Sequence, residues 1–263
     1  MSDATFTDID RPLAQSARIN RVPEVTPGFW LIKLTAVTMG ETAADLLAVN
    51  LGLGLGKTTL LMTAILIAAM IWQFRQRAYV PAVYWIAVVL ISVVGTLITD
   101  NMTDAFGIPL IDSTIGFTLA LAATFAVWYA VERTLSIHEV FTFRREAFYW
   151  LAILFTFALG TAVGDLISEA FGVGFAGTGV LFGLIIGSLA LGYFALGLDG
   201  MWAFWLCYIF TRPLGASIGD FLAQPTEFGG LGLGTVITSF VFLIVIASTV
   251  FVMTTKAAPE LAE

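Results

Sequence analysis

The sequence predicts an all-α membrane protein with eight transmembrane helices, arranged as four parallel two-helix repeats with pseudo-four-fold symmetry. Two observations predict it: the composition, and a motif that recurs four times. Of the 263 residues, 59% are hydrophobic and 12% are charged, and the mean hydropathy is +0.93. A soluble domain carries about 25% charged residues. We therefore expect lipid to surround most of this chain.

Eight apolar segments are long enough to cross a bilayer, for which about 20 residues suffice. They cover residues 28–48, 58–75, 82–103, 113–132, 147–169, 175–197, 201–222 and 233–254. We expect helices, because a helix satisfies its own backbone polar groups in lipid. The domain organisation is a polar cytoplasmic segment at 1–26, one transmembrane domain at 27–255 and a tail at 256–263. The polar start has no apolar core, so we expect no cleaved signal peptide.

Lys and Arg residues are distributed unequally between the two sides of the predicted spans. Nine lie on one side: Arg11, Arg18, Arg21, Arg75, Arg77, Arg133, Arg144, Arg145 and Lys256. Lys57 lies on the other side, and Lys33 and Arg212 fall inside spans. Positive charge marks cytoplasmic loops. Both the N- and C-termini are therefore predicted to be cytoplasmic.

One motif, W-x9-G-x4-D, begins every odd-numbered span. Its anchors are Trp30, Gly40 and Asp45; Trp85, Gly95 and Asp100; Trp150, Gly160 and Asp165; and Trp205, Gly215 and Asp220. The repeats cover about 28–77, 82–134, 147–198 and 201–255. Each contains two spans, so all four insert in the same orientation, and equivalent residues share one depth. Fifteen residues of helix, about 22 Å, separate Trp from Asp. Tryptophans near the cytoplasmic interface therefore place the aspartates in the outer half of the bilayer.

The four aspartates are the main candidates for a functional site. A carboxylate facing lipid is costly, so the odd-numbered spans should line the interior and the even-numbered spans should surround them. Carboxylates, hydroxyls and carbonyls suit hard cations, and acidic rings select cations in channels. The predicted cation- or metal-binding residues are Asp45, Asp100, Asp165, Asp220 and Glu41. The alternative is structural: an Asp before a glycine-rich loop can accept hydrogen bonds from the loop's N–H groups.

Three ionisable residues occur in one repeat only. Glu41 has the equivalents Thr96, Thr161 and Ala216, so it is a candidate ligand or proton carrier. Arg212 and Lys33 are predicted counter-ions or gating residues. Lys33 is expected to extend to the cytoplasmic interface, whereas Arg212 lies deeper and should pair with Glu41 or an aspartate. Pro213 is expected to kink its span.

Glycines at mid-span are expected to permit close contact between helices. This applies to the motif glycines, and also to Gly179, Gly183 and Gly187, which form a small-xxx-small face in the sixth span. Glycine-rich stretches follow the aspartate in three copies, at 51–56, 172–177 and 229–234. The second copy differs, reading Gly107-Ile-Pro-Leu-Ile-Asp112. The glycines therefore predict packing and turns, not chemistry.

Composition excludes several functional classes. Cys207 is the single cysteine and His138 the single histidine, so a disulfide within the chain, a Cys/His metal cluster and a Ser-His-Asp triad are excluded. No basic patch is dense enough for nucleic acid. We expect no enzyme activity and no resident cofactor.

The chain resembles a bacterial family of membrane proteins built from a four-fold transmembrane hairpin repeat of unknown function. The resemblance rests on the stretch from Val22 to Trp30, the segment from Met39 to Asp45, and the repeated G-x4-D. It covers residues 21 to about 256. It implies the topology and a multi-pass location in the cytoplasmic (inner) membrane, but no activity.

These observations favour an integral membrane transporter or channel for a small cation, most readily a divalent metal such as manganese or magnesium. The alternative is a non-transporting scaffold or partner subunit whose aspartates cap the glycine-rich loops. The expected partners are the lipid bilayer and the cation, and the sequence is also compatible with a homo-oligomer.

Overall fold

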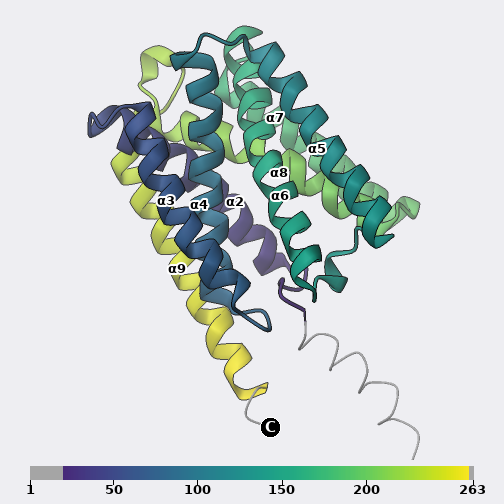
Figure 1. Ribbon diagram of the computed structural model, residues 1–263. Helices are drawn as coiled ribbons and strands as arrows, with labels where there is room; N and C mark the ends of the chain where they lie inside the picture. Colours follow the sequence, from purple (N-terminus) through teal and green to yellow (C-terminus); the bar gives the residue numbers. More distant parts are fainter. Residues whose placement is uncertain (1–19, 261–263) are drawn as a thin grey trace, which may run out of the picture.

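The computed structural model describes residues 20–260, and all the regular secondary structure in this range is helical (Figure 1). The predicted N-terminal segment lies largely outside these residues. The described residues form eight long helices: α2 (Pro27–Asp45), α3 (Leu55–Phe74), α4 (Pro81–Asp100), α5 (Leu110–Glu132), α6 (Phe143–Asp165), α7 (Gly174–Leu196), α8 (Gly200–Ala223) and α9 (Thr235–Glu260). Each corresponds to one predicted segment.

The two ends of the bundle have different connections (Figure 1). The linker end carries the connections 75–80, 133–142 and 197–199 and the end of α9. The aspartate end carries the connections that follow α2, α4, α6 and α8. Of the basic residues outside spans whose side chains are described, Lys57 lies at the aspartate end; the other six are at the linker end.

Local sequence explains where the inner helices begin. The Thr26 hydroxyl accepts a hydrogen bond from Phe29 N, and Pro27 follows at the first helical position. Thr142 caps α6 in the same way, and the Asp199 carboxylate caps α8. These side chains satisfy backbone N–H groups that a helix start leaves without partners.

Three of the four inner helices end in a single π-helical turn. It follows the motif aspartate directly, at Leu46–Asn50, Asn101–Ala105 and Leu166–Ala170. The fourth inner helix instead continues to Ala223. The copy that differs in structure is therefore the fourth, although the sequence singles out the second. Such π-helical turns are rare overall, and those that do occur often lie at functional sites.

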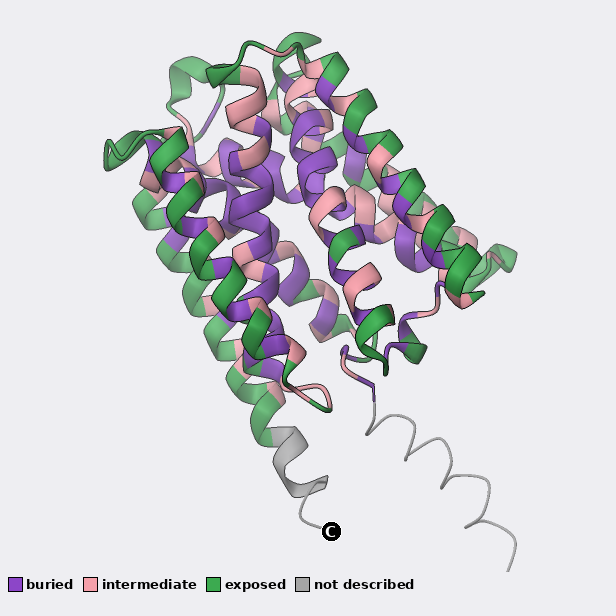
Figure 2. Ribbon diagram, viewed as in Figure 1, coloured by how far each residue is buried: buried purple, intermediate pink, exposed green. Residues whose placement is uncertain are grey.

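The eight helices form two concentric groups. Helices α2, α4, α6 and α8 contact one another in a closed cycle, α2–α4–α6–α8–α2. Each outer helix packs mainly on the inner helix of the following repeat: α3 on α4, α5 on α6, α7 on α8 and α9 on α2. Figure 2 shows that the inner helices are more buried than the outer ones. In the most apolar 18 residues of α4, 72% are buried, against 6% in α7. The prediction that odd-numbered spans lie inside is confirmed.

Six of the described helices are long and apolar enough to cross a membrane: α3, α4, α5, α6, α7 and α9. Helices α2 and α8 are not among them. They carry Lys33, Glu41, Arg212 and Asp220, which are buried within the bundle. The protein is therefore a multi-pass membrane protein, and the charged side chains of α2 and α8 named above are enclosed by the other helices.

The motif glycines lie where the inner helices touch. Each faces a side chain of the next inner helix, three residues before that helix's own glycine. A Cβ added at Gly40, Gly95, Gly160 or Gly215 would lie 2.0 Å from Ser92 Oγ, 2.8 Å from Phe157 Cβ, 2.2 Å from Arg212 Cγ and 2.5 Å from Val37 Cγ1, respectively. These distances are far below van der Waals contact, so the predicted packing role is confirmed for all four.

The same prediction is wrong for most of the sixth span. Nothing lies within 4 Å of a Cβ built on Gly183 or Gly187, and Gly179 has only an ordinary contact with Ser217 at 3.8 Å. Helix α7 packs on α8 along one side only, and these glycines lie largely outside that contact. Spacing alone could not tell which side of the helix is covered.

Candidate functional site

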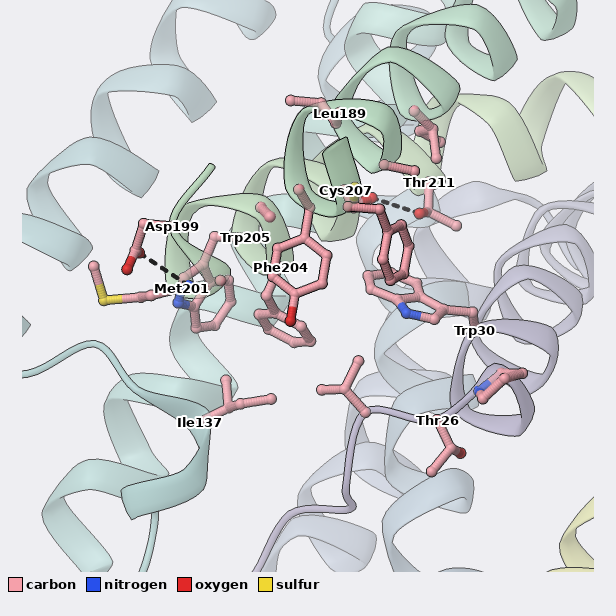
Figure 3. Close-up of a pocket in the computed structure, with 18 of the residues that line it drawn as sticks. Thr26, Trp30, Ile137, Leu189, Asp199, Met201, Phe204, Trp205, Cys207 and Thr211 are labelled. Atoms are coloured by element: carbon pink, nitrogen blue, oxygen red, sulfur yellow. Dashed lines mark hydrogen bonds between the residues drawn. The ribbon is translucent and has the colours of Figure 1, made fainter. Parts of the chain in front are cut away.

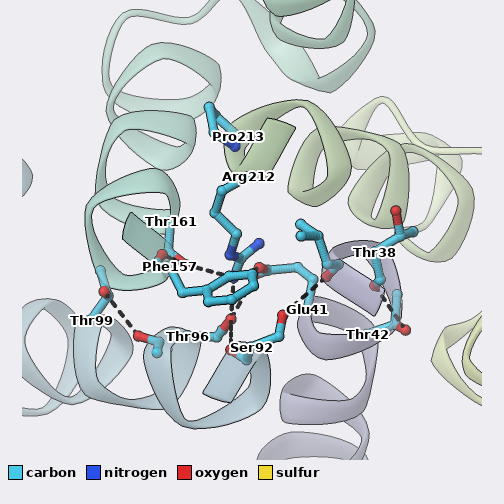
Figure 4. Close-up of polar contacts among 12 residues, drawn as sticks. Thr38, Glu41, Thr42, Ser92, Thr96, Thr99, Phe157, Thr161, Arg212 and Pro213 are labelled. Carbon is cyan, nitrogen blue, oxygen red and sulfur yellow. Dashed lines mark hydrogen bonds and ion pairs between the residues drawn. The ribbon is translucent and has the colours of Figure 1, made fainter. Parts of the chain in front are cut away.

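The interior of the inner ring contains a polar cluster from all four inner helices (Figure 4). Arg212 Nη2 donates to Glu41 Oε2 at 2.7 Å and to Thr161 Oγ1 at 2.7 Å, and it also donates to Thr96 Oγ1. The Thr96 hydroxyl donates in turn to Glu41 Oε2 at 3.2 Å. Glu41, Thr96 and Thr161 each follow a motif glycine. We call these three residues and Arg212 the polar layer.

Arg212 replaces the missing fourth member of this layer. The equivalent position on α8 is Ala216, which has no polar atom, and Arg212 extends one turn along the same helix to reach the others. Its side chain is 0% exposed and that of Glu41 is 8% exposed. The predicted pairing of Arg212 with Glu41 is therefore confirmed. A buried pair of this kind is weak evidence for stability in itself, but removing one partner is strongly destabilising.

The four aspartates lie one helical turn beyond the polar layer, about 6 Å further toward the aspartate end. Three of them are half-buried and Asp220 is 9% exposed. Asp45 Oδ2 accepts a hydrogen bond from Gln224 Nε2 at 3.3 Å. The side chains of Asp100, Asp165 and Asp220 make no hydrogen bond to any described residue, yet none of their oxygens is among the fully enclosed atoms.

The loop N–H groups bond to backbone carbonyls and not to these carboxylates. Gly54 N donates to Ala48 O at 3.0 Å. After α8, Leu231 N and Leu233 N donate to Phe221 O and Leu222 O at 2.6 and 3.0 Å. A Cβ on Gly230 would lie 2.0 Å from Gln224 O, so only glycine permits this close return. Among the described residues, the glycine-rich loops therefore do not require the aspartates as caps.

The aspartates also do not form a compact metal centre. Among the described residues, no three His, Cys, Asp or Glu side chains lie close enough to hold one ion. The inner helices touch at the motif glycines, five residues before the aspartates, and the carboxylates stand past this point of contact. The described residues therefore do not form a site in which all four carboxylates coordinate one ion directly, and the assignment of the aspartates to a cation site stays a prediction. Beside Asp45, a pocket of about 700 Å³ opens at the aspartate end, lined also by Asn50, Gln224 and Thr235.

Lys33 does not reach the interface, so that expectation is wrong. Its side chain is 0% exposed, and Nζ has no hydrogen-bond partner. The amine lies 4.1 Å from the centre of the Tyr208 ring and 5.3 Å from that of Phe157. Helix α2 turns this position toward α6 and α8, away from lipid, and the neighbouring aromatic rings enclose it.

An aromatic layer near the linker end was not predicted from the sequence. It consists of the residues directly before each motif tryptophan, and all are buried: Phe29, Tyr84, Tyr149 and Phe204. The two tyrosine hydroxyls are 2.5 Å apart, and the rings of Phe29 and Phe204 are 5.9 Å apart. The signal was available, since the repeat is more fully F/Y-W-x9-G-x4-D.

The motif tryptophans pack inside the protein more than the interfacial prediction allowed. Trp85, Trp150 and Trp205 are at most 4% exposed. Their indole N–H groups donate within the protein; Trp205 Nε1, for example, donates to Leu135 O at 3.0 Å. Together with the aromatic layer they close the linker end of the interior.

A separate apolar pocket of about 890 Å³ lies at the linker end, between α2, α7, α8 and the 133–142 connection (Figure 3). Trp30, Phe204 and Trp205 line it, and Cys207 and His138 also reach it. No side chain of the polar layer and none of the four aspartates lines this pocket. It is therefore distinct from the candidate site.

Comparison of the chain with known protein families supports the four repeats. A family model described as a Repeat of Unknown Function (DUF347) matches residues 28–79, 83–134, 148–197 and 203–257. No curated protein and no solved structure matches the chain. The four matched ranges follow the repeats that the motif defines. The chain therefore belongs to this family, whose members are recognised by a repeat of unknown function.

Proposed function

We propose that the protein transports a small cation, with a divalent metal such as manganese or magnesium as the leading candidate, through the interior of its inner helix ring. The observation that carries the proposal is the Arg212–Glu41 pair inside this ring, one turn from four carboxylates. In the proposed topology all eight helices span the inner membrane, pseudo-four-fold around this axis, with both termini cytoplasmic. The aspartates then face the outside.

The carboxylates support a site for a hydrated cation. Intramembrane carboxylates are costly and usually functional, and three of these make no hydrogen bond to a described residue. Mg²⁺ gives up its waters reluctantly and often binds through one or two carboxylates. Spaced carboxylates that do not form a direct cluster suit an ion that keeps part of its water shell.

The polar layer supports a role as a gate. Arg212 occupies the position a cation would need in order to reach Glu41, and it neutralises that carboxylate while the site is empty. A cation arriving from the aspartates competes with Arg212 for Glu41. Pro213 removes one backbone hydrogen bond from α8 next to Arg212, which makes this the point where α8 bends most easily. An element that must move favours a carrier over an open channel.

Asp100→Asn tests this function. In liposomes containing the purified chain, Mn²⁺ uptake should fall by about tenfold or more, as expected when a group that holds a metal is removed. The matched control is Asp112→Asn, an exposed acid in the first turn of α5, which should transport like the wild type. A folded wild type without uptake of Mn²⁺ or Mg²⁺ would contradict the proposal and leave the scaffold alternative.

A further inference from the structure

Lys33 is an amine buried in the inner ring without an acidic partner. Its side chain is 0% exposed, and Nζ neither forms a hydrogen bond nor has enough accessible surface for a water molecule to contact it. Glu41, the acid in the polar layer, is already paired with Arg212. The contacts that remain for the amine are the faces of the Tyr208 and Phe157 rings.

The groups around Lys33 do not favour a positive charge. Tyr208 and Arg212, both on α8, face it. The Lys33 amine and the Arg212 guanidinium lie 5.3 and 5.8 Å from the centre of the same Phe157 ring, so the guanidinium would repel a charged amine. At these levels α4 presents Val88 and Ser92, and α9 has no ionisable residue from Thr235 to Thr255. Removing an ammonium from water without a partner costs more than contacts with two aromatic rings return.

We propose that Lys33 is a proton-binding site of the transporter. The amine is neutral in this closed conformation, and its lone pair takes up a proton when the linker end opens and water reaches it. The proton comes from a hydronium ion, whose O–H bond breaks as the N–H bond forms, which leaves water and the ammonium. The proposal rests on the proposed function, because it makes the proton the ion that is exchanged for the transported cation.

The position of Lys33 explains how the two ions are separated. Contacts among Phe29, Phe204 and Tyr208, with ring centres 5.5–6.4 Å apart, close the linker side of Lys33. The polar layer closes the other side. When the aromatic contacts open, a proton can reach Lys33 from the linker end while the polar layer still separates it from the aspartates, which a cation approaches from the opposite end. A charged Lys33 and an incoming cation repel each other across the polar layer, which favours exchange over co-transport.

The first test is coupling in liposomes that contain a pH-sensitive dye. An imposed Mn²⁺ gradient should move protons in the opposite direction in the wild type. Lys33→Met should reduce this proton movement by about tenfold or more, within the range of linked binding sites, while Mn²⁺ still crosses. Lys57→Met, which alters an exposed lysine of α3, should behave like the wild type. Undiminished proton movement in Lys33→Met overturns the proposal.

The second test requires no transport. The wild-type amine must give up a proton to be buried, and this becomes easier as pH rises. Lys33→Met should therefore have the higher Tm near pH 6, and the difference should shrink toward about pH 10. Lys33→Leu serves the same purpose if the methionine variant does not fold. A difference that is independent of pH overturns the proton site. A shrinking difference in a protein that moves no cation supports the site and rejects the proposed function.

Discussion

Replacing Arg212 with methionine is expected to destabilise the folded protein by about 3–5 kcal/mol, the usual effect of removing one partner of a buried ion pair. The Glu41 carboxyl group, buried inside the inner ring, would lose its 2.7 Å bond to the guanidinium. The hydroxyls of Thr96 and Thr161 would lose the same donor. Thermal or denaturant unfolding of the purified protein in detergent measures the loss.

A double variant distinguishes the loss of the ion pair from the effect of leaving one charge unpaired. Glu41→Gln combined with Arg212→Met leaves no unpaired charge in the layer, so stability should recover most of the loss. Arg144→Met is the exposed control, since the Arg144 side chain is 66% exposed in its pair with Glu132. It should cost no more than about 1 kcal/mol. A single Arg212→Met as mild as this control would show that Glu41 is not held by Arg212.

Adding a single methyl group at Gly40 should also be strongly destabilising. In Gly40→Ala, the new Cβ would lie 2.0 Å from Ser92 Oγ, 2.5 Å from Ser92 Cβ and 3.1 Å from the Ser92 backbone carbon. Rotating the hydroxyl cannot relieve the last two contacts, so α2 and α4 must move apart. We expect a loss of about 3 kcal/mol, at the upper end for overpacking, measured by unfolding in detergent.

Gly183→Ala is the matched control, because nothing lies within 4 Å of its Cβ. In a helix interior, alanine is favoured over glycine by about 1 kcal/mol. This variant should therefore be as stable as the wild type or slightly more stable. Equal effects at Gly40 and Gly183 would mean that the inner helices do not meet at the motif glycines.

The sequence predicted the parts of this structure that depend on spacing. The motif fixes one glycine and one aspartate per inner helix, and the cost of burying carboxylates placed these helices inside. The Arg212–Glu41 pair could also be anticipated, because both residues occur once and lie at similar depth. These predictions need only periodicity and the energetics of charge in lipid.

Other features depend on three-dimensional neighbours that spacing does not reveal. Lys33 could not be assigned to the interior from spacing alone. Positions four residues apart on a helix differ by about 40° around its axis, and the lysine side chain is long enough to reach either side. The π-helical turns have no known sequence signal in this chain. The spacing of Gly183 and Gly187 would be the same whether or not another helix packed on that face of their helix.

The order of packing around the ring has a consequence for biosynthesis. Helix α2, the first of the eight to leave the ribosome, receives its outer cover from α9, the last. No repeat is a self-contained unit, because the second helix of each repeat packs mainly on the first helix of the next repeat around the ring. A nascent chain that ends before Thr235 leaves one side of its earliest helix uncovered. The contact between α2 and α9 thus closes the described helix bundle, and it can form only after α9 has been synthesised.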